Sequence, residues 1–146
     1  MSTTPKDLTR EAPRSPRLRI GGYPILARCL DKGRASIAGK VGEYHFDCPL
    51  DNFLFSFKGV TGAEIHTLLT EGKTDEEIIA WLNSHGTPKT EEEVTSWSDG
   101  FEAVSPYHDP EKKEWFISQC EPLGLHADKA TLFDMLEADD LHTFAK

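Results

Sequence analysis

The chain has 146 residues, of which 38% are hydrophobic and 28% are charged, so it can bury a core and is not disordered throughout. No stretch approaches the ~20 apolar residues of a membrane-spanning helix, and the first residues contain no apolar segment typical of a secretory signal. Three cysteines without C-x-x-C spacing argue against a disulfide framework. We therefore expect a cytoplasmic protein with no membrane partner.

Charge is divided unevenly along the chain, whose formal net charge is −9. Residues 1–40 contain nine Lys or Arg and three Asp or Glu, whereas residues 41–146 contain seven and twenty-two. Because residues 41–146 are so acidic, they lack the broad basic face that binds phosphates, and we expect no nucleic-acid partner. The basic segment has two readings: ion pairing with the acidic body, which is the simpler one, or binding of a small anion.

In chain order, residues 1–16 contain three prolines and few apolar residues. This composition predicts an N-terminal arm with the potential for flexibility, followed by one helical domain over residues 17–146. The first helix is expected from Pro24 to near Gly39. Its buried stripe is predicted to comprise Leu26, Leu30, Gly33 and Ile37. On the opposite face, Arg28 and Lys32 are predicted to be exposed to solvent.

A short extended segment is expected near residues 43–46, followed by a helix from Pro49 to Gly59. Three T-x-x-E motifs then predict three further helix starts, because a capping box pairs both side chains with backbone amides. The motifs are Thr61–Glu64, Thr74–Glu77 and Thr90–Glu93.

A sixth helix is expected to start at Asp109-Pro110. A seventh is expected over about residues 129–136, with a last turn near 139–144. Because strand-like alternation is almost absent, the sequence predicts an all-α fold, a compact single domain of about seven short helices.

Cys48 and His45 are the candidate catalytic residues. Cys48 precedes Pro49, so we expect it at the N-cap of a helix, where free amides and the helix dipole stabilise a thiolate. His45 lies three residues earlier and could act as a base. The charges of Asp47 and Asp51 oppose a thiolate, and the simpler alternative is a small buried cysteine with a structural role.

No metal site and no cofactor are predicted. His45 and Cys48 have a spacing that could supply two zinc ligands, but no second pair stands at a diagnostic spacing. An H-E-x-x-H motif is also absent from the sequence.

The candidate ligand-binding residues are Arg17, Arg28, Arg34 and Tyr44. Arginine forks bind carboxylate or phosphate through two hydrogen bonds, and the turn expected at Gly21-Gly22 would let the backbone approach a ligand closely. In this hypothesis Arg17 and Arg34 clamp a small anion that Tyr44 orients. Salt bridges from these arginines to the acidic body are the simpler alternative.

Five segments of the chain resemble a bacterial family catalogued as domain of unknown function 5069. They are PRSPRLRIGGY (13–23), LDKGRA (30–35), GEYHF (42–46), CPLD (48–51) and TLFDMLEADD (131–140). The resemblance covers nearly the whole chain and implies one domain. It implies no activity, and it draws attention to residues 14–51, where the matching motifs concentrate.

Two classes of function therefore remain open. The favoured one is a non-catalytic interaction module that binds a protein partner or a second copy of the chain. The alternative is a binding protein or enzyme for a small anionic metabolite, using the basic segment with Tyr44, His45 and Cys48. The sequence does not decide whether the protein is an enzyme.

Overall fold

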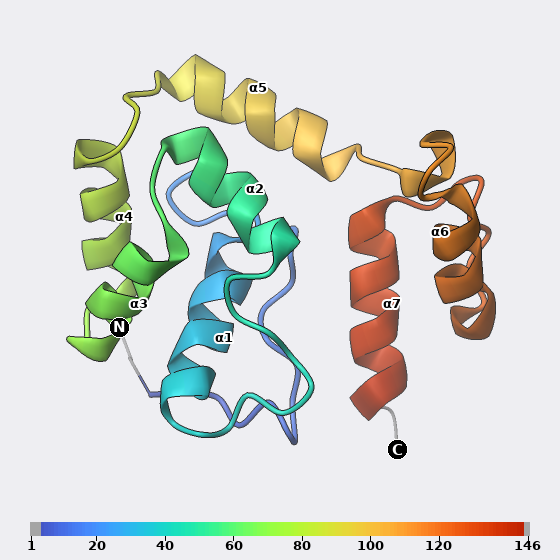
Figure 1. Ribbon diagram of the computed structural model, residues 1–146, viewed down its shortest axis with the longest axis horizontal. Coiled ribbons are helices and arrows are strands. Elements are labelled where there is room, and N and C mark those ends of the chain that lie inside the picture. Colours follow the sequence, from blue (N-terminus) through green and yellow to red (C-terminus); the bar gives the residue numbers. More distant parts are fainter. Residues whose placement is uncertain (1–3, 145–146) are drawn as a thin grey trace. The chain divides into compact units, whose positions relative to one another are not determined.

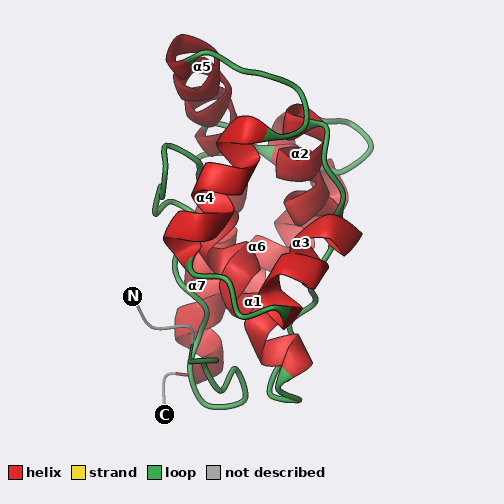
Figure 2. Ribbon diagram, turned by 90° about the vertical axis from the view of Figure 1, so that its left-hand side faces the viewer, coloured by secondary structure: helices red, strands yellow, loops and turns green. Residues whose placement is uncertain are grey.

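A computed structural model describes residues 4–144, which form seven α-helices, two short 3-10 helices and no strand. Figure 2 accordingly shows only helices and loops over this range. The all-α prediction is therefore confirmed. The helices are α1 (Leu26–Ile37), α2 (Pro49–Lys58), α3 (Gly62–Thr70), α4 (Asp75–Ser84), α5 (Glu91–Glu102), η1 (Pro106–His108), α6 (Lys113–Cys120), η2 (Glu121–Leu123) and α7 (Leu132–Phe144).

The three T-x-x-E motifs begin α3, α4 and α5 as predicted. In the first, the backbone amide of Thr61 donates to Glu64 Oε1 at 3.0 Å, and the Glu64 amide donates to Thr61 Oγ1 at 3.2 Å. The same reciprocal pair forms at the other two motifs. Pro49 is the first residue of α2 and Cys48 its N-cap, also as predicted.

Other boundaries differ from the predictions for local reasons. α1 begins at Leu26 rather than Pro24, because Ile25 adopts a left-handed conformation (φ 68°) that cannot belong to the helix. α6 begins at Lys113, since Asp109 caps a separate turn by accepting the Glu111 amide at 3.0 Å. No strand forms at residues 43–46, where a short extended segment was expected. Turns lie at residues 42–43 and 46–47, and the Tyr44 amide donates to the Val41 carbonyl at 3.1 Å.

The chain divides into two compact units, Met1–Thr95 and Ser96–Lys146. In unit 1, α1 contacts both α2 and α3 (Figure 1). Its buried apolar residues include Tyr23, Leu26, Leu30, Leu54, Phe55, Ile65, Ile78 and Leu82.

Unit 2 has a core of its own between α6, α7 and the two 3-10 helices. Phe116, Cys120, Ala130 and Met135 are buried at its centre, and Leu132 and Leu136 pack against them. α7 is one continuous helix where the sequence analysis expected two pieces. Its start is fixed by a reciprocal pair in which the Thr131 amide donates to Asp134 Oδ2 at 2.8 Å and the Asp134 amide donates to Thr131 Oγ1.

The described part of the predicted arm, residues 4–16, lies against unit 1. Leu8 is buried, and its amide donates to the Lys40 carbonyl at 2.8 Å. The Pro16 carbonyl accepts the Ile25 amide at 2.9 Å, which links the segment to the start of α1. None of the helices within residues 4–144 is long and apolar enough to cross a bilayer.

Candidate functional site

α1 is buried on all sides over Leu26–Ala35, including the face predicted to be exposed. Arg28 and Lys32 are each only 5% exposed, so that prediction is wrong. Segments before and after the helix cover its polar face. Asp31, Lys32 and Arg34 are held there in ion pairs, and Arg28 lies over the Tyr44 ring. Conversely, Ile37 was expected to be buried and is 43% exposed, because it lies in the last turn of the helix.

An ion-pair network joins the N-terminal segment, α1 and α4. Arg14 Nη2 lies 3.1 Å from Asp31 Oδ1, and Arg14 Nη1 donates to Asp75 Oδ2 at 2.9 Å. Arg34 Nη1 donates to the other oxygen of Asp75 at 2.7 Å, and its Nη2 donates to the Lys73 carbonyl at 3.1 Å. Nη1 and Nη2 of Arg34 are therefore both engaged by the protein itself.

Asp75 is the shared acceptor of this network and the first residue of α4. Burial alone would raise the pKa of Asp75, but the hydrogen bonds from Arg14 and Arg34 and their positive charges outweigh burial. The pKa of this carboxyl group therefore lies below its usual range. The Thr74 cap, readable in the sequence, places Asp75 in this position.

The second cluster contains Lys32, Cys48 and Asp51. Lys32 Nζ lies 3.0 Å from Asp51 Oδ1 and 3.4 Å from Cys48 Sγ. The carboxylate of Asp51 is fully buried, and its other oxygen accepts the backbone amides of Asp47 at 2.9 Å and Cys48 at 3.4 Å. The sulfur thus lies at the start of α2, beside a buried ammonium group.

The remaining predicted residues lie in separate surroundings. The guanidinium of Arg28 lies 5.5 Å from the centre of the Tyr44 ring, within range of a cation–π interaction. His45 is exposed in the loop before α2. The Arg17 amide donates to Ser15 Oγ at 3.1 Å, ahead of the glycine turn. The structure thus pairs Arg28 with Tyr44 and Cys48 with Lys32, while Arg34 is held at Asp75.

Within residues 4–144, no three His, Cys, Asp or Glu side chains are grouped so that they could hold a metal ion.

An open pocket of about 370 Å³ lies elsewhere in unit 1, between the Gly21-Gly22 turn, the end of α4 and the start of α5. Both glycines have positive φ values (60° and 89°), and Ile20 and Tyr23 pair across the turn. The pocket is lined by Gly21, Gly22, Tyr23, Asn83, Lys89, Glu91, Val94 and Thr95.

Two side chains fix the walls of this pocket. Tyr23, which is buried, donates its hydroxyl hydrogen to Asn83 Oδ1 at 3.1 Å and thereby orients the Asn83 amide. The cation of Lys89 lies 4.6 Å from the centre of the Phe57 ring. The pocket wall therefore carries a positive charge from Lys89, a negative charge from Glu91, and neutral polar groups from Asn83 and Thr95.

The loop before α5 is held in place by Lys58, the last residue of α2. Its carbonyl accepts the Thr87 amide at 2.6 Å, and its buried Nζ donates to the Thr87 carbonyl at 3.0 Å. Gly86 has φ 69°, and a Cβ there would collide with the Lys58 carbonyl, so this approach requires glycine. Burial lowers the pKa of Lys58, and the charge of Lys89 adds to this effect.

Sequence reasoning identified one wall of the pocket, the glycine turn, and missed Asn83, Lys89, Glu91 and Thr95. The Thr90 cap predicted a helix start close in sequence to Lys89, Glu91 and Thr95. No sequence signal indicated that this helix start lies against the Gly21-Gly22 turn, because the two meet only through a tertiary contact.

A family model described as Domain of unknown function (DUF5069) matches residues 10–142. No curated protein matches the chain. The match covers the segments on which the resemblance was based, and it extends across both compact units.

Proposed function

Because the chain belongs to the family described as Domain of unknown function (DUF5069), we propose a function from its own geometry. The protein is a non-catalytic binding protein that takes a small polar molecule in the pocket at the Gly21-Gly22 turn. The observation that carries this proposal is the pocket itself, of about 370 Å³, lined by polar groups from three segments of unit 1. Its volume falls within the range of about 300–1,000 Å³ that is typical of ligand sites.

The lining groups favour a ligand with both signs of charge. Lys89 can pair with an acidic group, and Glu91 with an ammonium group. Asn83 and Thr95 supply hydrogen-bonding groups, and the glycine turn lets a ligand approach the backbone. These groups suit a free amino acid. The proposal keeps a small charged ligand but moves its site away from Arg34, which is already bound to Asp75.

A non-catalytic role is favoured by the composition of the lining. It contains neither cysteine nor histidine, the side chains that most often serve as nucleophile and base. The hydroxyl group of Tyr23 is already used in orienting Asn83.

The test is a titration of the full ¹⁵N-labelled chain with glycine, glutamate and lysine, followed by NMR. We expect saturable shifts of the amide signals of Gly21, Gly22 and Thr95. Lys89→Gln should weaken binding at least about tenfold, because a hydrogen bond to a charged group contributes about 1.5–3 kcal/mol. Lys129→Gln, at an exposed lysine of unit 2, should bind as wild type does. Shifts confined to other residues, or none at all, would refute the proposal.

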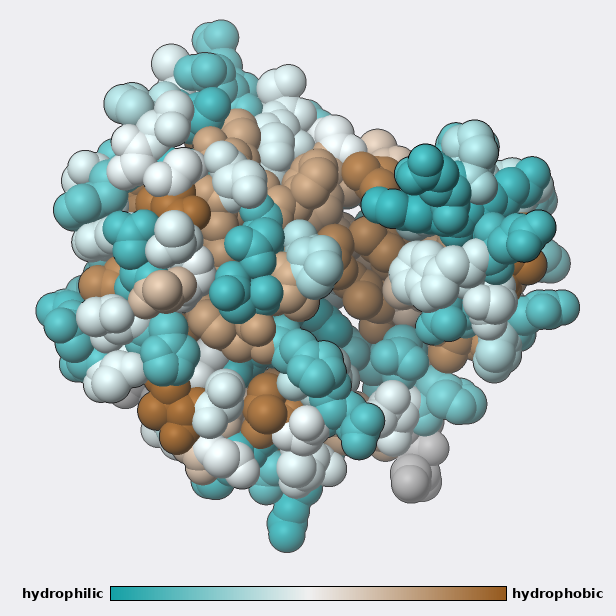
Figure 3. All heavy atoms as spheres, viewed as in Figure 1, coloured by the Kyte–Doolittle hydropathy of each residue, from teal (hydrophilic) through white to brown (hydrophobic). Residues whose placement is uncertain are grey.

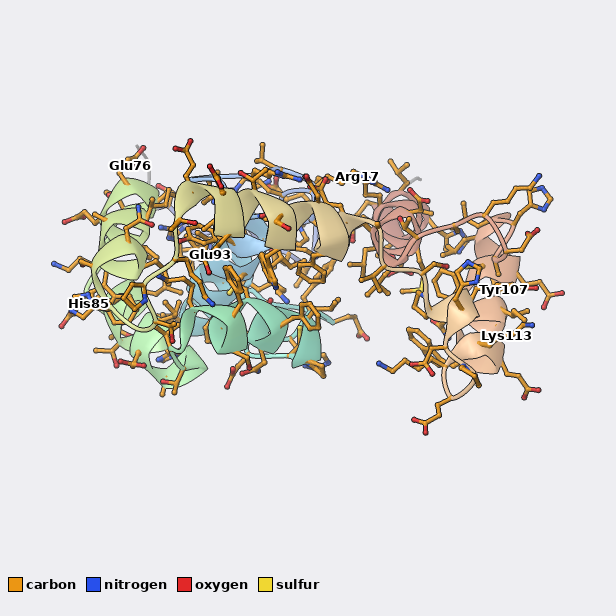
Figure 4. All side chains as sticks on the ribbon, turned by 90° about the horizontal axis from the view of Figure 1, so that it is seen from above. Arg17, Glu76, His85, Glu93, Tyr107 and Lys113 are labelled. Carbon is orange, nitrogen blue, oxygen red and sulfur yellow. The ribbon has the colours of Figure 1, made fainter. Side chains whose placement is uncertain are left out.

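A second candidate function is association with a second copy of the chain, the interaction role favoured by the sequence. Trp115 on α6 is 48% exposed, and large aromatic residues are enriched at protein interfaces. On the same helix, Lys113 Nζ lies 4.4 Å from the centre of the Tyr107 ring. Both residues are labelled in the view from above (Figure 4). In unit 1, Phe53 is also 50% exposed. The space-filling view shows hydrophobic residues at the surface among the polar ones (Figure 3).

Sedimentation velocity over a range of protein concentrations tests this candidate. Association that Trp115→Ser weakens would support it, whereas a monomer at all concentrations would exclude it. Because Trp115 does not line the pocket, this result is independent of the titration above.

A further inference from the structure

The cluster of Lys32, Cys48 and Asp51 is used neither by the pocket nor by the exposed face of α6. We propose that it is an oxidative modification site, at which peroxide converts Cys48 to a sulfenic acid that condenses with Lys32. The product is a covalent bond between Cys48 Sγ and Lys32 Nζ, a sulfenamide that joins α1 to the start of α2.

Geometry is the first argument. Lys32 Nζ lies 3.4 Å from Cys48 Sγ, so the two atoms that would bond are already in contact. The lysine side chain is 6% exposed and is held by Asp51, whose carboxylate oxygen lies 3.0 Å from the same nitrogen. A buried side chain held in this way keeps its nitrogen beside the sulfur.

The contrast with the other two cysteines is the second argument. Cys48 is partly exposed, whereas Cys29 and Cys120 are fully buried. Burial raises the pKa of both buried thiols, and the charges of Asp51 at Cys29 and Asp134 at Cys120 add to it. Since the thiolate is the form that reacts and peroxide must reach it, oxidation should begin at Cys48.

The chemistry balances with peroxide as the only added reagent. The Cys48 thiol and hydrogen peroxide give a sulfenic acid and one water, and the sulfur is oxidised by two electrons. Lys32 gives one proton to Asp51, and its freed electron pair attacks the sulfur. The S–O bond breaks, and hydroxide leaves with a second proton from the nitrogen as water. Sulfenic acids condense with backbone nitrogen in the same way.

The consequence is the loss of an ion pair from the core. Lys32 becomes a neutral nitrogen, and Asp51, which has taken up its proton, keeps its contacts with the backbone amides of Asp47 and Cys48. A thiol reductant should reverse the bond by attacking the sulfur, which releases the lysine. The site is therefore a reversible covalent cross-link between α1 and the N-cap of α2.

Mass spectrometry of the full chain after treatment with hydrogen peroxide tests the proposal. We expect a cross-linked peptide containing Lys32 and Cys48, lighter by two hydrogens than the sum of the two unmodified peptides. Trypsin should no longer cleave after Lys32, and dithiothreitol should restore both peptides. The link should persist in a Cys29→Ser variant, which excludes a disulfide with that neighbour.

Variants sharpen the result. Cys48→Ser and Lys32→Arg should abolish the link, whereas Lys40→Arg, at an exposed lysine just after α1, should retain it. If Lys32→Arg fails to fold, the fragment spectrum of the wild-type cross-link still identifies the bonded residues. The proposal is overturned if Cys48 proceeds to sulfinic acid while trypsin still cleaves after Lys32, or if the link retains an oxygen atom.

Discussion

Asp75 provides the sharpest test of how unit 1 is held together. Its carboxylate joins the N-terminal segment to α1 and α4 by accepting from both Arg14 and Arg34. The perturbation is Asp75→Asn, which keeps the shape of the side chain and removes its charge. Arg14 then still pairs with Asp31, but Arg34, whose side chain is 8% exposed, loses its carboxylate partner.

The expected loss of stability follows from this difference. Removing one partner of a buried ion pair costs about 3–5 kcal/mol, mainly because a charge is left uncompensated. Since only Arg34 is stranded, we expect the lower end, about 3 kcal/mol. This is a large share of the ~5–15 kcal/mol that stabilises an ordinary domain, and it corresponds to a fall in melting temperature of about 12 °C or more.

The assay is urea unfolding followed by the fluorescence of Trp81, with Trp97 and Trp115 replaced by phenylalanine so that only unit 1 reports. For a slope of about 1–3 kcal/mol per molar, the midpoint should fall by about 1–3 M. The matched control is Glu76→Gln at the next residue of α4, an exposed position at the edge of the molecule in Figure 4. It should cost no more than about 1 kcal/mol, the effect of one charge on the helix dipole.

The reasoning would be refuted if Asp75→Asn cost no more than the control. A second comparison separates charge from packing. Replacing the pair together, Arg34→Met with Asp75→Leu, should cost less than Asp75→Asn alone, because no buried charge then lacks its opposite. Equal or larger losses in the double variant would show that shape, not charge compensation, dominates at this position.

Three further predictions follow from individual contacts. Because the pKa of Asp75 is lower in the folded than in the unfolded chain, the unfolded chain binds more protons than the folded chain below about pH 4, and stability should fall as the pH drops through that range. A melting temperature that declines equally with pH in Asp75→Asn would contradict this. Gly33→Ala should destabilise unit 1 by about 1–3 kcal/mol, because a Cβ there collides with Leu69. Gly100→Ala, where a Cβ would meet nothing within 4 Å, should stabilise α5 by about 0.5–1 kcal/mol. Changes of the same sign in urea unfolding would contradict the packing argument. Thr61→Ala should cost about 1 kcal/mol in the same assay and Thr61→Ser much less, since only serine preserves the cap; equal losses would exclude the capping hydrogen bond as the cause.

Helix starts were the part of the fold most readable from sequence. A capping box is formed entirely within four consecutive residues: a threonine and a glutamate three positions later bond each other's backbone amides. The local sequence alone therefore determines whether it forms. Pro49 is readable for the same reason, because its ring suits a first helical position whatever surrounds it. The left-handed conformation of Ile25, which moves the start of α1, could not be predicted from the sequence. It accompanies a hydrogen bond from the Ile25 amide to the Pro16 carbonyl, nine residues earlier.

The candidate site was readable only in part. The sequence placed Cys48 at the N-cap of α2, which the structure confirms, but gave no sign that Lys32 lies beside the sulfur. It also identified the glycine turn but not Lys89 or Glu91, which complete the pocket wall. Each missing partner comes from a separate helix or loop, and the sequence pattern carries no information about which surfaces meet.

By itself, the sequence determined an all-α chain, the caps of its helices and an excess of basic residues near α1, since these depend on composition and on neighbours along the chain. Tertiary structure alone decided what the basic residues do. Arg28 and Lys32 have the spacing of a solvent-exposed face, yet both are buried, Lys32 in an ion pair with Asp51 and Arg28 over the Tyr44 ring. A charged helix face is stable in the interior only when such partners arrive from elsewhere, and only the folded chain brings them there.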